Sequence, residues 1–171
     1  TNLVKNEILT LEIVNFIKKH NIRLNSDFSI FINSGPGSFS GVRISLAVAK
    51  GMQLVKKINI YSYNSFLLNA APYLGEKKEM YSIQKNNNFY YFCHVTFEGK
   101  YYFTHPEKLD LNKFPKTDSL FIIPDNIKND EIIKNIDPGK IRYAAFNLKN
   151  IDLLVKNNLV ENKLIKPLYL S

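Results

Sequence analysis

The sequence predicts an α/β protein, and two observations carry this prediction. Residues 28–63 contain an apolar run, a glycine-rich turn, a helical pattern and a second apolar run, which is the order of a β-α-β unit. From residue 79 onward, aromatic and polar residues alternate between Asn and Gly turns, which is typical of antiparallel strands. The 171 residues are enough to bury a core, and we expect two lobes, 1–75 and 76–171.

The first half of the chain predicts helices alternating with buried strands. Residues 3–19 place apolar side chains at steps of three and four and end on Lys18 and Lys19, so we expect an amphipathic helix. The run "FSIFIN" is continuously apolar, as in a strand of a parallel sheet. The elements expected next are a helix over 42–56, a strand at "INIYSY" (58–63) and a short helix over 65–71.

The second half predicts a meander and then mixed elements. Turns are expected at residues 86–88 and at Glu98 and Gly99. Beyond the meander we expect a strand at "SLFIIPDN", a weak helix over 130–135, a helix around 148–155 and a closing tail, "KLIKPLYLS".

Composition excludes several classes of protein. The single Cys93 excludes a disulfide framework within one chain, and no apolar run approaches the roughly 18 residues of a membrane span. We therefore expect a cytoplasmic protein with no membrane association. The net charge of +8 has two interpretations: a basic face for an acidic partner such as RNA, or the composition of a Lys- and Asn-rich proteome, since the lysines are scattered.

Three of the seven glycines stand in residues 35–41, here called the glycine corner. The position five residues after Gly35, where a Walker A motif needs its second glycine, is Ser40, and the dinucleotide fingerprint fails at the same residue. Neither Ser38 nor Ser40 has glycines two residues before and after it, so a nucleophile elbow fails too. Two interpretations remain: a tight strand-to-helix joint in which Ser38 or Ser40 caps the helix, or an anion or partner site.

The stretch "GPGSFSGVRISLAVAKGMQL" resembles the signature of the TsaB (YeaZ) family, GPGSFTGLRIG followed by an A-x-A-K-G-L helix. "INIYSYNSFLLNAA" and the closing "IKPLYL" resemble two further family segments, so the resemblance covers most of the chain. It implies a ribonuclease H-like fold of the actin and Hsp70 ATPase type, with mixed sheets and flanking helices.

The resemblance also implies a function. TsaB proteins are non-catalytic partners of TsaD, which with TsaE transfers a threonylcarbamoyl group to the adenosine beside the anticodon of tRNAs that read ANN codons. They dock on TsaD through the helices of the N-terminal lobe, and homodimers use much the same surface. For this chain it implies no enzyme activity and no cofactor of its own, a TsaD-type partner, a TsaE-type ATPase in the same complex, a possible homodimer and indirect contact with tRNA.

The apolar pattern of the two N-terminal helices agrees with a protein-docking role. Both are apolar on more than one side, which leaves apolar surface beyond what one sheet covers. The small side chains of the second helix, with Ala49 expected on its outer side, would let a partner helix approach closely; they belong to Ser45, Ala47, Ala49 and Gly51. Alternatively, that helix is sandwiched inside its own domain. The predicted partner-binding residues are Gly35, Pro36, Gly37, Ser38, Phe39, Ser40, Gly41, Arg43, Ser45, Ala47, Ala49 and Met52.

The sequence departs from the family pattern at two places. Family members begin with an I-D-T-S strand and a hairpin, neither of which is present, so we expect a truncated N-terminal lobe from which upstream residues were removed. The family element D-A-R-x-G-E-V-Y aligns with "QKNNNFY", residues 84–90, which lacks the Asp and the Arg. The hairpin itself is expected to persist with Asn in its turn.

We predict no catalytic residue, because the candidates are poor. His20, His94 and His105 belong to separate elements, with no zinc-site spacing, and Cys93 reads as a buried apolar residue. Arg43 in the first turn of its helix is either paired with a carboxylate or solvated. Two alternative functions stay open: a glycoprotease-like hydrolase using Ser38 or Ser40, and a nucleotide-binding module of the ASKHA superfamily.

Overall fold

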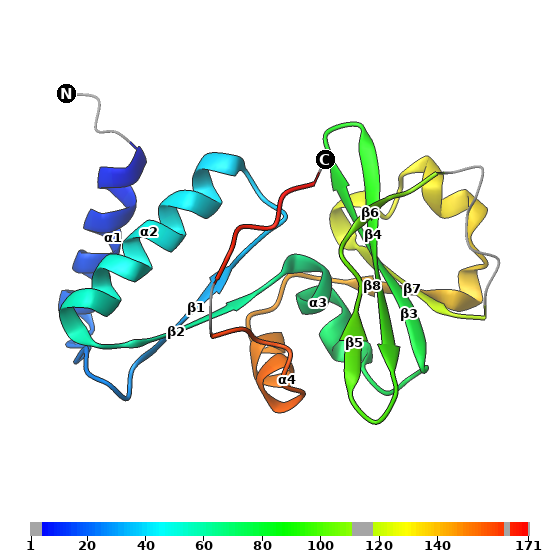
Figure 1. The fold of residues 1–171 in the computed structure, drawn as a ribbon. Coiled ribbons are helices and arrows are strands. Elements are labelled where there is room, and N and C mark those ends of the chain that lie inside the picture. The colour runs from blue at the N-terminus through cyan, green and yellow to red at the C-terminus, as the bar shows by residue number, and fades with distance from the viewer. Residues whose placement is uncertain (1–4, 111–117, 163–164, 171) are drawn as a thin grey trace.

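The computed structural model describes residues 5–110, 118–162 and 165–170. Its strands form a two-stranded parallel sheet and a six-stranded mixed sheet, which lie beside each other along the long axis of the molecule (Figure 1). The helices are α1 (Lys5–Lys19), α2 (Phe39–Lys56), α3 (Ser65–Ala70) and α4 (Asn150–Lys156). The strands are β1 (Ser29–Asn33), β2 (Asn59–Tyr63), β3 (Glu79–Asn86), β4 (Phe89–Phe97), β5 (Tyr101–Phe103), β6 (Glu107–Lys108), β7 (Leu120–Pro124) and β8 (Ile141–Ala144).

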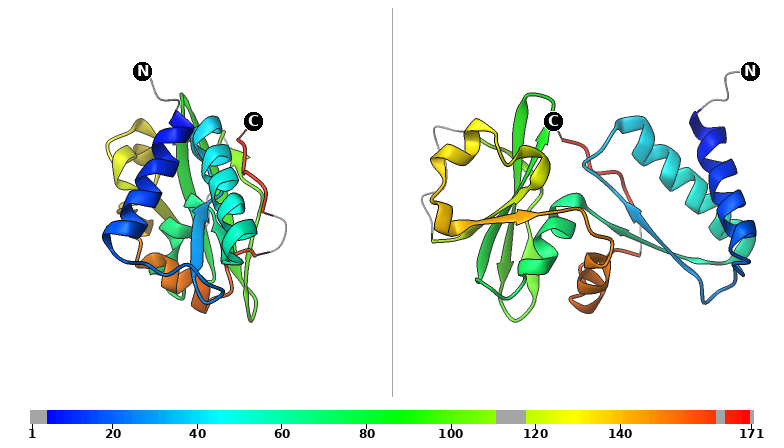
Figure 2. Two further views of the ribbon diagram at one scale, coloured as in Figure 1. Left: turned by 90° about the vertical axis from the view of Figure 1, so that its left-hand side faces the viewer. Right: turned by 180° about the vertical axis from the view of Figure 1, so that it is seen from behind.

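The predicted β-α-β unit is confirmed. β1 pairs with β2 in parallel, from Ser29 opposite Asn59 to Asn33 opposite Tyr63, and α2 connects the two strands. α2 packs on both strands and α1 packs against α2 (Figure 2). Ile32 and Ile60 of the sheet form a small core with residues of α2 and of the C-terminal tail, namely Leu46, Ala49 and Ile165.

The predicted meander is confirmed as the antiparallel part of the larger sheet, whose strand order is β5-β4-β3-β7-β8, with β6 also pairing with β4. β7 and β8 extend the sheet in parallel, and β8 is a strand that the sequence interpretation missed. The helix expected at 130–135 is a short 3-10 helix, Glu131–Asn135. Other 3-10 turns are Ala71–Tyr73, Asp125–Ile127 and Pro138–Lys140.

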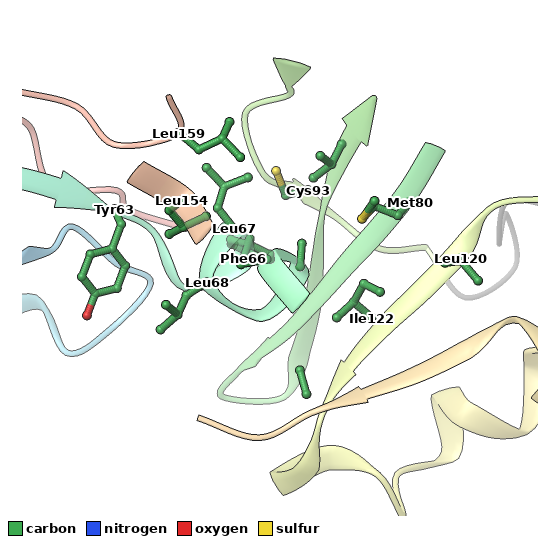
Figure 3. Close-up of a cluster of buried hydrophobic side chains, with 14 of the residues drawn as sticks. Tyr63, Phe66, Leu67, Leu68, Met80, Cys93, Leu120, Ile122, Leu154 and Leu159 are labelled. Atoms are coloured by element: carbon green, nitrogen blue, oxygen red, sulfur yellow. The ribbon is translucent and has the colours of Figure 1, made fainter. Parts of the chain in front are cut away.

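The alternation of side chains along the strands divides the larger sheet into two buried faces. Met80 and Ile122 point to the face covered by α3 and α4, where Phe66 is fully buried (Figure 3). Ile83 and Ile123 point to the opposite face, which the 3-10 turns of residues 125–140 cover.

α3 joins the two parts of the molecule. It follows β2 directly, yet its buried side chains belong to the core of the six-stranded sheet. Ser82 of β3 strengthens this contact by donating its hydroxyl to the carbonyl oxygen of Phe66, at 2.8 Å. The division into lobes at residue 75 stays a prediction.

Candidate docking surface

The glycine corner is a tightly packed joint between β1, α2 and the C-terminal tail. Gly35 has φ +123°, a conformation that favours glycine, and a Cβ atom there would lie 2.6 Å from the carbonyl oxygen of Leu168. The Leu168 N–H donates to the carbonyl oxygen of Ser34 at 2.7 Å. Pro36 follows Gly35 through a cis peptide bond. Gly35 is therefore required both for its backbone angle and for the close approach of the tail.

Side chains of the same chain already bind N–H groups of the corner. The Gly35 N–H donates to Oδ1 of Asn33 at 2.9 Å, and the Gly41 N–H donates to Oγ of Ser38 at 3.1 Å. Ser38 is thereby the N-cap of α2, and of the two residues expected for that role, Ser38 and Ser40, the structure selects the first. Because two donors that a phosphate cradle would use are taken by Asn33 and Ser38, the geometry favours the joint over an anion site.

The corner is also tied to α3. Nδ2 of Asn33 donates to Oγ of Ser65 at 2.8 Å, and the Ser65 N–H donates to the carbonyl oxygen of Gly35 at 2.8 Å. These bonds fix the direction in which α2 leaves the sheet, because they hold the loop immediately before it. Gly37 and Ser40 are exposed, and the side chain of Phe39 lies outside the described part of the structure.

The predicted site residues on α2 lie on two different sides of the helix, one facing the sheet and one exposed. Ala49 is only 3% exposed and packs in the small core above β1 and β2, so the expectation that it lies on the outer side of the helix is wrong. Ser45 also lies on the sheet side and donates its hydroxyl to the Gly41 carbonyl oxygen at 2.9 Å. Ala47 and Arg43 are exposed, and Met52 is half-buried between α1 and α2.

The outer side of the two helices carries an apolar groove, here called the helix groove. Its volume is about 380 Å³, and α1 and α2 contribute nearly all of its walls. Gly51 lines it and leaves open space, with no atom within 4 Å of the position its Cβ would occupy. The other lining residues are Thr10, Ile13, Val14, Ile17, Leu24, Val48, Met52, Val55 and Lys56.

Large apolar side chains are also exposed on the same two helices. Leu54 is 84% exposed and Val55 is 75% exposed on α2, and Ile8 and Leu11 are about half-exposed on α1. In the view along the long axis, the two helices form the outermost layer (Figure 2, left). The predicted partner-binding residues include Met52 but not Val48, Gly51 or Val55, although Gly51 was among the small residues expected to let a partner helix approach closely.

Cys93 and His94 lie in β4, apart from the helix groove, whereas His20 follows α1 and its ring contacts that of Phe16. Cys93 is fully buried in β4, where burial raises the pKa of its thiol to about 12, and its Sγ–H donates to the carbonyl oxygen of Thr104 at 3.3 Å. His94 stacks on Tyr81, with ring centroids 4.5 Å apart. The described residues contain no cluster of three His, Cys, Asp or Glu side chains that could hold a metal ion.

The hairpin at the divergent element is confirmed. β3 and β4 pair from Glu79 opposite Thr96 to Asn86 opposite Phe89, and Asn87 in the turn has φ +53°. Asparagine tolerates this left-handed conformation better than most residues.

Within the described part of the chain, no helix has the length and apolar character that a membrane span requires.

Comparison with known proteins finds similarity both in sequence and in structure. No family model matches the chain. The tRNA threonylcarbamoyladenosine biosynthesis protein TsaB of Buchnera aphidicola subsp. Baizongia pistaciae (strain Bp) is 35% identical over 88 residues, which are 43% of this chain and 40% of that protein. The match thus spans about two-fifths of the length of the curated relative.

Both similar structures come from Pseudomonas aeruginosa. One is an uncharacterized protein with similarity to peptidase YeaZ; it is 13% identical, has a TM-score of 0.64, and the match covers 99% of this chain and 85% of that one. The other is YeaZ, 15% identical with a TM-score of 0.63, covering 99% and 87%. These structures share the fold, which is ribonuclease H-like as expected. The sequence match and the shared fold both support the resemblance to TsaB (YeaZ) proteins.

Proposed function

We propose that the chain is a non-catalytic scaffold that binds a TsaD-type catalytic paralogue in tRNA threonylcarbamoyladenosine biosynthesis. The observation that carries this proposal is the helix groove with its apolar rim. A groove between two helices, lined by a glycine and aliphatic side chains, accepts the ridge of a partner helix. The TsaB relative from Buchnera supports the pathway.

The remaining partners follow from the same proposal. A TsaE-type ATPase belongs to the complex, and the chain contacts tRNA only through the catalytic partner. A homodimer would compete with the catalytic partner for the helix groove, because both use the same apolar surface.

The contact residues of this proposal differ from those expected from the sequence. We propose Ala47, Gly51, Met52, Leu54 and Val55 of α2, together with Leu11 and Val14 of α1, as the contact set, with the glycine corner fixing the direction of α2.

The experiment is a binding measurement with the cognate TsaD-type protein by calorimetry. Gly51→Arg fills open space, and Val55→Arg places a charge on the apolar rim, so both variants should stay folded and lose at least about 30-fold in affinity. Phe146→Arg is the matched control, because Phe146 is 71% exposed on the loop before α4, and this variant should bind as the unaltered chain does.

Three results would contradict the proposal: no complex with the unaltered chain, undiminished binding by both arginine variants, or an equal loss in the Phe146→Arg control.

A peptidase assay distinguishes the scaffold from the alternative that the chain is a hydrolase. Ser38→Ala removes the N-cap of α2 and should lower stability by about 1 kcal/mol without removing an activity. Activity that disappears in this variant would instead identify an enzyme.

A further inference from the structure

The edge of β8 that faces away from β7 has no partner strand among the described residues, yet most of its outward backbone groups are bonded within the chain. The Ile141 N–H donates to the carbonyl oxygen of Pro138 instead of to β7. Along a parallel pair, alternate residues direct their backbone groups to the neighbouring strand. Arg142 and Ala144 therefore face β7, and the backbone groups of Ile141 and Tyr143 point to the outer edge.

Two side chains bond the outward carbonyl oxygens of this edge. Nη1 of Arg142 donates to the carbonyl oxygen of Ile141 at 2.9 Å and, at 3.4 Å, to that of Gly139. The hydroxyl of Tyr73 donates to the carbonyl oxygen of Tyr143. Among the outward groups of Ile141 and Tyr143, the Tyr143 N–H is the one for which the described residues offer no partner.

One turn, residues 73–76, holds both donors at the edge. The Glu76 N–H donates to the Tyr73 carbonyl oxygen at 3.1 Å, and Gly75 between them has φ +96°. The Glu76 carboxylate accepts from Nε of Arg142 at 2.8 Å, which fixes the guanidinium while its Nη1 bonds the strand. Burial raises the pKa of the Tyr73 hydroxyl above its ordinary value, so the hydroxyl stays protonated and donates at neutral pH.

These contacts matter because an edge strand with open N–H and C=O groups is a template to which another chain can add a strand. An incoming strand would have to displace the ring of Tyr73 and the guanidinium of Arg142 to reach both carbonyl oxygens. A second copy of the chain is the partner that this arrangement concerns, since every copy carries a β8 and two such edges can pair about a two-fold axis.

We propose that Tyr73 and Arg142 close the edge of β8 to strand addition and thereby prevent two copies of the chain from pairing through this edge. The turn of residues 73–76 acts as the clamp, because it positions one donor directly and the other through Glu76. The helices α1 and α2 take no part in this closure, so it does not depend on the function proposed above.

The experiment opens the edge with two small changes. Tyr73→Phe removes only the hydroxyl, and Arg142→Leu removes the guanidinium but keeps an aliphatic side chain. Both are placed in the Gly51→Arg chain, whose helix groove is filled, so that association through that groove does not contribute. Sedimentation velocity measures the mass across a range of protein concentrations, and hydrogen exchange is measured at the Tyr143 amide.

We expect this opened-edge variant to form dimers as its concentration rises. The Tyr143 amide should exchange at least about tenfold more slowly in the dimer, because a paired strand bonds this N–H. The Gly51→Arg parent should keep the same mass and the same exchange rate at every concentration. Tyr73→Phe alone keeps the Arg142–Glu76 ion pair, so it should shift both measurements in the same direction by a smaller amount.

The matched control removes the same two kinds of group elsewhere on the six-stranded sheet. The hydroxyl of Tyr90 and Nζ of Lys85 both donate to the carboxylate of Asp130 at 2.7 Å, rather than to a backbone carbonyl oxygen at an edge. Tyr90→Phe combined with Lys85→Leu should therefore leave the mass and the exchange of the Tyr143 amide as in the parent. Circular dichroism checks that both double variants are folded, and Tyr73→Phe alone decides the test if the opened-edge variant is not.

The proposal is overturned if the opened-edge variant keeps the mass of the parent at every concentration, or if its dimers leave exchange at Tyr143 unchanged. Slow exchange at Tyr143 in the dilute parent, or equal dimer formation by the control, would also overturn it. None of these results affects the proposed scaffold function, which is tested by the binding of the TsaD-type partner.

Discussion

At the scale of single residues, the corner depends on Gly35, for which two constraints coincide. Its φ of +123° favours glycine, and the carbonyl oxygen of Leu168 occupies the space a Cβ atom would need. Gly75 shares only the first constraint, because its φ is +96° and nothing lies within 4 Å of its Cβ position. Comparing substitutions at the two glycines therefore distinguishes the cost of backbone strain from the cost of steric contact.

We expect Gly35→Ala to lower the free energy of unfolding by more than Gly75→Ala does. The Gly75 variant should lose about 1–2 kcal/mol, the usual cost of a positive φ outside glycine, and the Gly35 variant should lose more because the tail must also move. Urea unfolding followed by circular dichroism measures both. Equal losses would show that the contact with Leu168 has no energetic importance.

The thiol of Cys93 provides a second prediction at this scale. Because burial raises its pKa to about 12, the thiolate that reacts with alkylating agents is almost absent at pH 8. We expect iodoacetamide to leave the native protein unmodified and to modify it once after unfolding in urea, as measured by mass spectrometry. Rapid modification of the native protein would mean that β4 opens or that Cys93 is accessible.

At the scale of elements, helical periodicity accounts for what the sequence could and could not predict about α2. Its bounds were predicted within a few residues, because its apolar period and the cap residue Ser38 are local features. The outward position of Ala49 was predicted wrongly, because Ser45, Ala47, Ala49 and Gly51 were treated as one face. Residues two apart on a helix point to opposite sides, so Ala47 and Gly51 face outward while Ser45 and Ala49 face the sheet.

β8 was missed for a different reason. Its sequence, "IRYA", is short, and Tyr143 is exposed, so the local pattern resembles a loop. Ile141 is buried because pairing with β7 places it in the core that the 3-10 turns cover. Pairing between strands distant in sequence is a property of the whole sheet, which local periodicity does not contain.

Gly51 in α2 gives a prediction about the helix itself. It lies in the interior of the helix with open space around it, so Gly51→Ala removes backbone freedom from the unfolded chain without creating a clash. We expect the free energy of unfolding to rise by about 0.5–1 kcal/mol. Thermal unfolding measures this change, and a lower midpoint would mean that Gly51 has a packing role that the geometry does not reveal.

At the scale of the whole molecule, the C-terminal tail closes the small core of the two-stranded sheet. Glu161 pairs through its backbone with Ser62 of β2, and Ile165, only 6% exposed, packs with Ile32 and Ile60. The helix α2 could be predicted from its local amphipathic pattern. The contacts of the tail with β1 and β2 join residues about a hundred positions or more apart, and no local pattern in the sequence predicts them.

We expect Ile165→Ala to lower the free energy of unfolding by about 2–5 kcal/mol, because it leaves a cavity in a core made of few residues. Leu148→Ala is the control, since Leu148 is 60% exposed and should change stability by less than about 0.5 kcal/mol. Urea unfolding of both variants tests the comparison. A small loss at Ile165 would mean that the tail contributes little to the core.

The contact between Leu168 and Ser34 has a consequence for synthesis on the ribosome. Residues emerge in order, so β1, α2 and β2 leave the exit tunnel long before the segment that completes their packing. Until residue 168 has been translated and released, the nascent chain displays Gly35, Ile32 and Ile60 without their cover. The packing of the two-stranded sheet is therefore completed only after the six-stranded sheet has been synthesised, although β1 and β2 precede that sheet in the chain.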